Sequence, residues 1–340
     1  MKFFFPQALY NNSSRWQIFP LIKTLKKESN NVFNSLELVK DKSEADVIIL
    51  PMSWNYYYRN NLIQDVLKLI YKEFTSGKPI ISFVFGDIGC KVPKDFKGIV
   101  YRSSGRKSKL PNTHKGFPIF VEDPLQKYYS EKNIIIKPFS QKPSVGFCGL
   151  AHGFGIQTIK EILKTAIKNL VSFLGLSHRD LDQVMSTTYF RWKILNNLKK
   201  SDKIISNFII RDSYRAGVKS DKDTHITTLQ FYDNIKDSDY VVCMRGAGNF
   251  STRFYETLAM GRIPVFINTD CLLPLEDKIN WKHHVVWVEY NERHLIAEKI
   301  LEFHKTLTET SINDLFLRNR KLWEDYLQLY PFFNATIYDY

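Results

Sequence analysis

The chain has 340 residues, which is too long for a typical single-core domain and suits two domains of ordinary size. Hydrophobic residues make up 44% and aromatic residues 14% of the chain, which excludes global disorder and supplies material for packed cores. The formal net charge of +13 is spread along the chain rather than gathered in one basic arm. It leaves three partners open: a nucleic acid, an anionic membrane surface or an anionic substrate.

The four cysteines lie far apart and form no C-x-x-C pair, which argues against a zinc cluster or disulfide framework and favours a reducing compartment. The start, MKFFFPQALYNN, lacks the length of a signal peptide's apolar region, and no later run reaches the ~20 apolar residues of a membrane span. The sequence therefore predicts a soluble protein. A glycan on the sequon Asn249-Phe250-Ser251 would block the motif described below, so the sequon favours the cytoplasm.

In chain order, the first half alternates strand-like runs with a helical pattern. ADVIILP (45–51) and PIISFVFGD (79–87) are compact, β-branched and ended by proline or Gly-Asp, as buried strands are. Between them, apolar residues at helical spacing predict an amphipathic helix that ends near Gly77. This unit predicts a parallel sheet. Residues 100–140 are expected to be rich in loops, and the domain junction is expected near KPFSQKPS (137–144).

The second half restarts the pattern. VGFCG (145–149) predicts a strand that enters the loop LAHGFG and is followed by a helix over 156–174. KIISNFIIRDSY (203–214) suggests a strand and a loop. YVVCMR (240–245), a helix from about Thr252 to Met260, and IPVFIN (263–268) form another strand–helix–strand unit. Two α/β domains in series follow, with ligand binding expected at the carboxyl ends of the strands, in a cleft between the domains.

The stretch CMRGAGNFSTRFYETLAMGRIPVF (243–266) contains the main candidates for ligand-binding residues. Arg245 and a glycine-rich loop precede Ser251, a good residue to cap the next helix, on which Arg253 and Glu256 share one face. The loop, the helix N-terminus and the two arginines predict an anion site, because a guanidinium can grip phosphate oxygens bidentately. Glu256 could accept hydrogen bonds from sugar hydroxyls. The alternative is a surface salt bridge between Arg253 and Glu256, worth ~0.2–0.5 kcal/mol.

The segment MRGAGNFSTRFYETLAMGRIPVFINTDCLLPLEDKINW resembles the C-terminal signature of the exostosin-type glycosyltransferases. That signature combines an Arg-Gly turn, Ser-x-Arg, a glutamate on the same helix, a Gly-x-Ile-Pro-Val strand, and Leu-Pro…Asp…Trp. Each part is present in this sequence, at Arg245-Gly246, Ser251, Arg253, Glu256, Gly261 to Val265, Leu273-Pro274, Asp277 and Trp281. The segments ADVIILP, VFGDIG and SVGFCG resemble the same family more weakly.

The resemblance implies an α/β fold of GT-B type, with two Rossmann-like domains that face a central cleft. Residues 1–140 would form the N-terminal, acceptor-side domain and residues 141–320 the nucleotide-sugar domain. Residues 321–340 would be a C-terminal helix and tail that pack back on the first domain. The implied activity is an inverting glycosyl transfer from a UDP-sugar to an oligosaccharide or lipid-linked glycan, in the synthesis of a surface polysaccharide. The alternative is a non-catalytic relative that binds a nucleotide or a carbohydrate.

Carried over from the family, Arg245, Ser251 and Arg253 would hold the diphosphate and Glu256 the ribose, with Gly246 and Asn249 in the same donor-binding loop. Arg211 and Tyr214, in the loop IIRDSYRAG, are further donor-binding candidates for phosphate contact or base stacking, against a purely structural loop.

Inversion needs a base for the acceptor hydroxyl and positive charge for the departing diphosphate. Asp87 is the first candidate base because it follows a strand end of the first domain, although an aspartate there could also simply form the turn. His152, in the first loop of the second domain, is the second candidate, although a lone loop histidine could be incidental.

The sequence predicts no metal cofactor. D-x-D pairs at Asp180/Asp182, Asp221/Asp223 and Asp237/Asp239 occur in unrelated contexts, and Asp237 and Asp239 precede a strand as turn residues would. His283 and His284 would point opposite ways on a strand. No aromatic-interleaved basic motif points to nucleic acid. The positive charge is therefore assigned to an anionic donor and acceptor, with peripheral contact of a cytoplasmic protein with a membrane left open.

Overall fold

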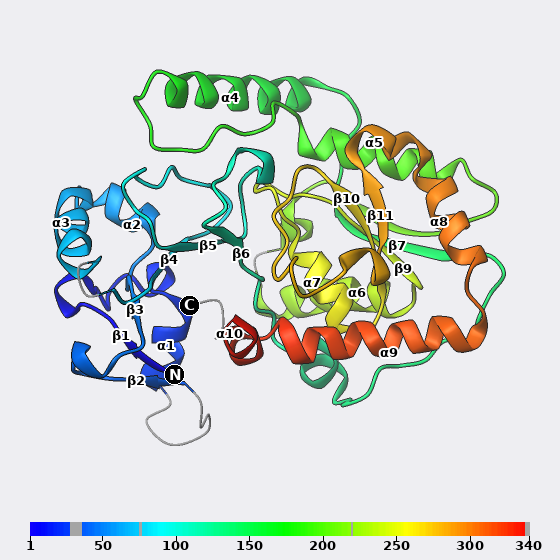
Figure 1. The fold of residues 1–340 in the computed structure, drawn as a ribbon. Helices are drawn as coiled ribbons and strands as arrows, with labels where there is room; N and C mark the ends of the chain where they lie inside the picture. Colours follow the sequence, from blue (N-terminus) through cyan, green and yellow to red (C-terminus); the bar gives the residue numbers. More distant parts are fainter. Residues whose placement is uncertain (28–35, 75–76, 219, 337–340) are drawn as a thin grey trace.

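The computed structural model describes residues 1–27, 36–74, 77–218 and 220–336, which form two α/β domains side by side (Figure 1). Each domain is built on one sheet of parallel strands, with helices packed against it. This arrangement confirms the predicted GT-B type of α/β fold, with two Rossmann-like halves. The division of the chain at residues 140 and 320 stays a prediction, and residues 337–340 of the expected tail lie outside the described residues.

The first sheet has the strand order β2-β1-β3-β4-β5-β6. Its strands are β1 (Lys2–Phe4), β2 (Glu37–Leu38), β3 (Val47–Ile49), β4 (Ile80–Val84), β5 (Ile99–Arg102) and β6 (His114–Gly116). Its helices are α1 (Pro20–Lys27), α2 (Trp54–Arg59) and α3 (Ile63–Phe74). All residues of β3 and β4 are buried, as expected for parallel strands covered on both faces, which explains their unbroken apolar runs.

The second sheet has the order β11-β10-β9-β7-β8, again fully parallel. Its strands are β7 (Ser144–Leu150), β8 (Ile205–Arg211), β9 (Tyr240–Cys243), β10 (Ile263–Asn268) and β11 (Val286–Glu289). The helices α5 (Thr187–Lys199) and α8 (Ile296–Lys305) cover one face. The helices α6 (Asp221–Lys236), α7 (Thr252–Ala259) and α9 (Glu309–Tyr326) cover the other. A further helix, α4 (Ile156–Phe173), lies away from the sheet.

The order of the second sheet creates a switch point between β7 and β9. The chain moves from β7 outward to β8, then returns across β7 to continue with β9, β10 and β11 on its other side. The loops that follow β7 and β9 therefore diverge at the carboxyl edge of the sheet and leave a crevice there, which is where open α/β sheets bind ligands.

The C-terminal helices connect the two domains. Helix α9 packs on α7 and β10 of the second domain, and the short helix α10 (Leu329–Thr336) then reaches the first domain. There the ring of Phe333 lies 5.7 Å from the ring of Phe19 and 6.0 Å from those of Tyr101 and Phe117. The chain thus adds an aromatic contact between the domains beyond the single linker that joins them.

Several elements differ from the predictions. The apolar start of the chain forms the strand β1, of which Phe3 is buried, and the region expected to be loop-rich contains β5 and β6. Helices α5 and α6 were not predicted. The strand expected around His283 and His284 is wrong: Trp281–His283 is a 3₁₀ helix, and β11 begins only at Val286. Among the described residues, no helix combines the length and apolarity that crossing a membrane requires.

The packing of α10 leads to a test of the contact between the domains. Phe333 is fully buried, so the substitution Phe333→Ala should lower the free energy of unfolding by about 3–5 kcal/mol, measured by urea denaturation. The control Leu317→Ala, on the half-exposed face of α9, should change it by only about 0.5 kcal/mol. Equal effects of the two substitutions would show that α10 does not hold the domains together.

Candidate functional site

Arg253 occupies the switch point of the second sheet. It lies in the first turn of α7, and its guanidinium reaches back across the ends of two parallel strands. Its Nη2 donates a hydrogen bond to the Cys148 carbonyl of β7 at 2.6 Å, and its Nη1 donates one to the Val242 carbonyl of β9 at 3.4 Å. The guanidinium also lies 4.2 Å from the centre of the Phe147 ring. The side chain is therefore fixed at the place where a ligand is expected.

Two more arginines join it. Arg245 follows β9 and is 2% exposed, and its Nη1 and Nη2 donate to the two carboxylate oxygens of Asp182 at 3.0 and 2.9 Å. Arg191 comes from α5, and it donates to the Leu150 carbonyl at 3.3 Å and the Arg245 carbonyl at 3.0 Å. Three guanidinium groups thus converge on the ends of β7 and β9. Sequence reasoning missed Arg191 and considered Asp182 only as part of a D-x-D pair, because no local pattern links either residue to the glycine-rich loop.

The cluster contains buried hydrogen-bond donors that its neighbours leave unused. The Nε atoms of Arg191, Arg245 and Arg253 are buried and have no hydrogen-bond partner among the described residues. Burial, together with the nearby Arg253, lowers the pKa of Arg191 to about 10, and burial lowers the pKa of Arg253 as well. Buried donors without acceptors are rare in folded proteins. The arrangement is therefore suited to receive an anion with several acceptor oxygens.

Glu256 lies one turn further along α7. Its carboxylate accepts a hydrogen bond from the Tyr232 hydroxyl at 3.2 Å. Burial raises the pKa of this carboxyl to about 7, and the neighbouring Arg253 and the Tyr232 hydroxyl oppose the shift. The helix is packed into the domain and the hydrogen bonds of Arg253 go to backbone carbonyls, so a surface salt bridge between Arg253 and Glu256 does not describe this pair.

The other donor-binding candidates differ in the contacts that they make. The Gly246 N–H donates to the Phe250 carbonyl at 3.0 Å, which closes the loop, and Ser251 caps α7 by position without a side-chain capping hydrogen bond. Arg211 ends β8 and donates to the Thr227 carbonyl of α6 at 2.8 Å. Tyr214 begins a 3₁₀ helix, Tyr214–Gly217, and the placement of its side chain lies outside what the structure describes.

Asn249 joins the two domains. Its Nδ2 lies 2.9 Å from the Gly105 carbonyl of the first domain and 3.0 and 2.9 Å from the carbonyls of Thr269 and Asp270. Its Oδ1 accepts from the Thr269 hydroxyl at 2.7 Å. These contacts use the whole amide group. Asn249 therefore acts as a bridge between the domains, and its predicted donor-binding role stays a prediction.

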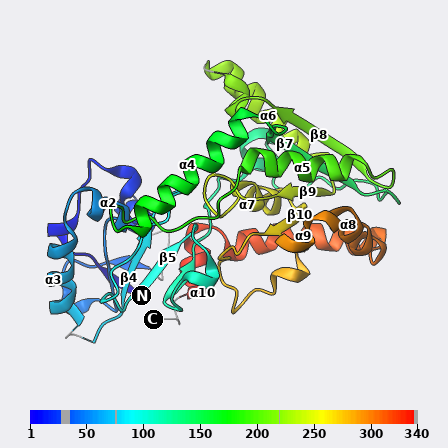
Figure 2. The same ribbon diagram turned by 90° about the horizontal axis from the view of Figure 1, so that it is seen from above.

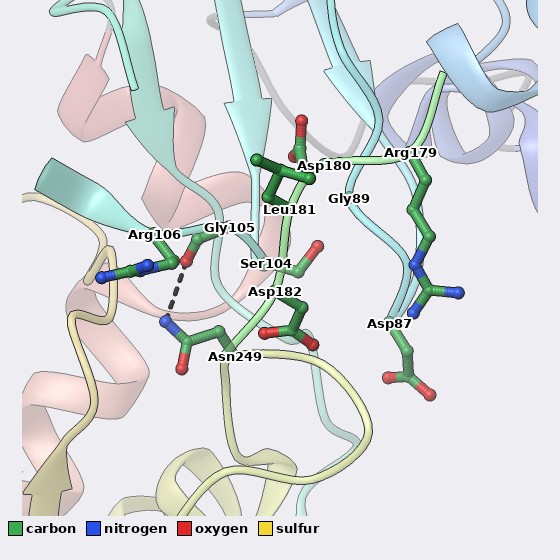
Figure 3. A pocket seen from close by; sticks show the side chains of 10 residues that line it. All are labelled: Asp87, Gly89, Ser104, Gly105, Arg106, Arg179, Asp180, Leu181, Asp182 and Asn249. Carbon is green, nitrogen blue, oxygen red and sulfur yellow. Dashed lines mark hydrogen bonds between the residues drawn. The ribbon is translucent and has the colours of Figure 1, made fainter. Parts of the chain in front are cut away.

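Asp87 faces the same junction. With Asn249, Arg179, Asp180 and Asp182 it lines a small pocket between the domains, with a volume of about 20 Å³ (Figure 3). The donor loop touches Asp87 directly: a Cβ added to Gly248 would lie 2.8 Å from the Asp87 carbonyl oxygen, so only glycine permits this approach. The structure thus brings Asp87 to the glycine-rich loop.

His152, the second candidate base, is not among the residues that line this pocket. It belongs to the loop after β7, and its backbone N–H donates to the Thr188 carbonyl at 3.3 Å.

Three acidic residues of the D-x-D pairs have partners within the protein. Asp182 binds Arg245, and Asp180 forms an ion pair with the buried Arg102 of the first domain. The carboxylate of Asp239, at the amino end of β9, accepts from Ser144. Among the described residues there is no group of three or more His, Cys, Asp or Glu side chains placed to hold a metal ion.

The fold and the site define a two-domain α/β protein with a cluster of three arginines at the switch point of its second sheet. The chain belongs to the family of the Exostosin GT47 domain, whose model matches residues 125–302, more than half of its length. The arginine cluster and the bridge at Asn249 lie inside this range.

The chain is 25% identical to Exostosin-1 of Drosophila melanogaster over 232 residues, which are 67% of this chain and 26% of that protein. It is 29% identical over 92 residues to a probable glucuronosyltransferase of Oryza sativa subsp. japonica, which covers 27% of this chain and 20% of that protein. The chain thus spans about a quarter or less of these relatives. A glycosyltransferase from Rickettsia africae ESF-5 is structurally similar, with a TM-score of 0.38, 14% identity and coverage of 94% of this chain and 87% of that one.

The raised pKa of Glu256 predicts a pH dependence of stability. Because folding raises this pKa from 4.5 to about 7, the folded state favours the protonated carboxyl. This contribution is full below about pH 4.5 and is lost as the pH rises through about 7. Glu256→Gln should therefore remove a decline of up to about 3 kcal/mol across that range, measured by urea denaturation. Glu302→Gln, at an exposed site, is the control, and identical pH curves for the wild type and Glu256→Gln would contradict the expected shift.

Proposed function

We propose that the chain is an inverting glycosyltransferase that moves a sugar from a UDP-sugar to a glycan acceptor. The observation that carries this proposal is the set of three buried arginine Nε atoms, all without partners among the described residues, at the switch point. A diphosphate offers several oxygen atoms that can accept hydrogen bonds from these donors, and its negative charge complements the guanidinium groups. Membership of the exostosin family supports the choice of a nucleotide-linked sugar over other diphosphates.

In this proposal the donor lies across the ends of β7 and β9. Arg253 and Arg191 bind the diphosphate from the two faces of the sheet, and Arg245 contributes while it stays paired with Asp182. The uncapped N-terminus of α7 at Ser251 adds backbone N–H groups that favour an anion. The Glu256 carboxyl, one turn further along α7, forms hydrogen bonds with the ribose hydroxyls. Its pKa of about 7 allows the carboxyl to accept or donate hydrogen bonds near neutral pH.

The reaction step is a single displacement. The acceptor hydroxyl oxygen forms a bond to the anomeric carbon while the bond from that carbon to the diphosphate oxygen breaks, and the bonding electron pair stays on the diphosphate. The hydroxyl proton passes to the carboxylate of Asp87, whose backbone contacts Gly248 of the donor loop from the first domain. The arginines stabilise the charge that develops on the leaving group, a role that does not require a metal ion.

The small pocket at Asp87 implies movement between the domains. A volume of about 20 Å³ is close to that of a single water molecule, so a sugar can lie there only after the domains separate. The contacts that would have to loosen are polar. They include the bond from Asn249 to the Gly105 carbonyl and the hydrogen bond of the Ser108 hydroxyl to Asp270 at 2.7 Å. Such contacts exchange readily with water, which is suited to a cleft that opens and closes.

The wider setting is also part of the proposal. The acceptor would be an oligosaccharide or a lipid-linked glycan, the process the synthesis of a surface polysaccharide, and the compartment the cytoplasm. The basic character of the chain, with a net charge of +13, supports anionic substrates in general and does not select among them.

The donor site can be tested by calorimetric titration with UDP, GDP and CMP. We expect UDP to bind and Arg253→Gln to weaken the affinity at least about tenfold, because a charge-assisted bond to phosphate is lost. Arg253→Lys keeps the charge but loses the bidentate geometry, so its affinity for UDP should lie between those of the wild type and Arg253→Gln. Arg318→Gln, at an exposed site on α9, is the matched control. Failure of the folded wild type to bind any of the nucleotides, with or without an acceptor sugar, would contradict the donor site.

The catalytic base can be tested once a donor and acceptor pair has been found. Asp87→Asn should lower kcat by about 10²–10⁴ while UDP affinity stays unchanged, because the base acts only on the acceptor proton. His152→Gln is the matched comparison, since His152 lies outside the pocket. A larger loss with His152→Gln than with Asp87→Asn would reverse the assignment. Proton NMR of the product's anomeric signal gives the stereochemistry, and retention would refute the single displacement.

A further inference from the structure

Helix α4 presents its polar side to the protein. Glu161 accepts hydrogen bonds from the Ser186 hydroxyl at 2.7 Å and from the Thr188 hydroxyl at 3.1 Å, both at the start of α5. The Asn169 Nδ2 donates to the Asp182 carbonyl at 2.7 Å, and the Asn169 Oδ1 accepts from the Asp182 N–H at 3.0 Å. At the C-terminal end of the helix, Lys91 of the first domain donates to the Ser172 carbonyl at 2.8 Å. The helix is therefore attached mainly by hydrogen bonds, and it bridges the two domains (Figure 2).

The apolar side of α4 points to the solvent. Large apolar residues repeat every three or four positions and are between 46% and 73% exposed; they are Ile156, Ile159, Leu163, Ile167 and Leu170. This spacing places them in one stripe along a helix that is ~27 Å long. Phe154 before the helix and Leu174 after it extend the stripe and are exposed as well. A surface helix normally turns such a stripe toward the core, so this one is inverted.

A row of lysines lies beside the stripe. Lys160, Lys164 and Lys168 each follow an apolar residue of the stripe by one position, so they occupy the adjacent flank of the helix. The only acidic residue within α4 is Glu161, which is engaged on the inner side. Burial and the nearby Arg179 and Lys164 lower the pKa of Lys168, which agrees with positive charge that the helix itself does not neutralise.

We infer that the outer face of α4 binds an anionic membrane surface, with the apolar stripe inserted at the boundary of headgroups and acyl chains and the lysine row against the headgroups. An apolar stripe flanked by lysines is the pattern of helices that lie in the plane of a membrane. A second copy of the chain fits less well, since α4 offers no exposed carboxylate to pair with the lysines of another α4. The position of α4 at the edge of the molecule, away from both sheets, leaves the stripe accessible (Figure 1).

This inference does not depend on the proposed transferase activity. It concerns a face formed by α4, whereas the anion site lies at the ends of β7 and β9. Nucleotide binding and membrane binding can therefore succeed or fail separately. If both hold, the bridge that α4 makes between the domains would present the cleft close to the membrane surface, where a lipid-linked acceptor could enter it.

The test is flotation with vesicles made of equal parts phosphatidylcholine and phosphatidylglycerol, compared with vesicles of phosphatidylcholine alone. The wild type should bind the anionic vesicles. The double variant Leu163→Gln with Ile167→Gln should lower the bound fraction about tenfold or more, because each side chain loses its apolar transfer to the membrane. Lys160→Gln with Lys164→Gln should reduce binding to the anionic vesicles and leave binding to the neutral ones unchanged.

The matched control is Leu317→Gln on α9, where the leucine is 53% exposed against 55% for Leu163. It should bind as the wild type does. Circular dichroism and urea denaturation establish that each variant is folded. The inference is overturned if the wild type does not bind anionic vesicles, or if the α4 variants bind them as well as Leu317→Gln does. It is also overturned if sedimentation shows a dimer in solution that Leu163→Gln with Ile167→Gln converts to monomers.

Discussion

A guanidinium group held between two parallel strands organises the second domain and its site. Arg253 reaches the carbonyls of Cys148 on β7 and Val242 on β9, on either side of the switch point. Gly149 permits this approach, because a Cβ there would lie 2.9 Å from the Arg253 Nη2. The buried Nε of Arg253, like those of Arg191 and Arg245, has no hydrogen-bond partner among the described residues. This unused donor capacity is the basis of the anion site proposed above.

The two halves of the site lie on different domains, so their geometry depends on how the domains meet. Asp87 comes from the first domain and contacts the glycine-rich loop of the second, where Asn249 joins the same two domains through the Gly105 carbonyl. The ion pair of Arg102 with Asp180 and the packing of α10 on the first domain add to this junction. One junction thus combines polar contacts with an apolar contact.

The inverted helix α4 belongs to the same arrangement. It starts on the second domain, where Glu161 is bonded to residues of α5, and it ends against Lys91 of the first. The segment that follows it supplies Asp180 and Asp182, one for an arginine of each domain. A force on the outer face of α4 would therefore act on the junction and on the partner of Arg245, which connects this face physically to the arginine cluster.

Local patterns in the sequence determined the two α/β domains, most strands of the second sheet and the motif from Arg245 to Glu256. These features depend on neighbouring residues: the apolar runs of parallel strands, the glycine-rich turn, and the helical spacing that puts Arg253 and Glu256 on one face. The short strands β5 and β6 carry little periodicity and were missed. Only the tertiary structure decided that Arg191 joins the site, that Asn249 joins the domains and that α4 faces outward. Each of these depends on contacts between residues far apart in the chain, such as Arg191 with the Arg245 carbonyl and Asn249 with Gly105, and no local pattern encodes such contacts.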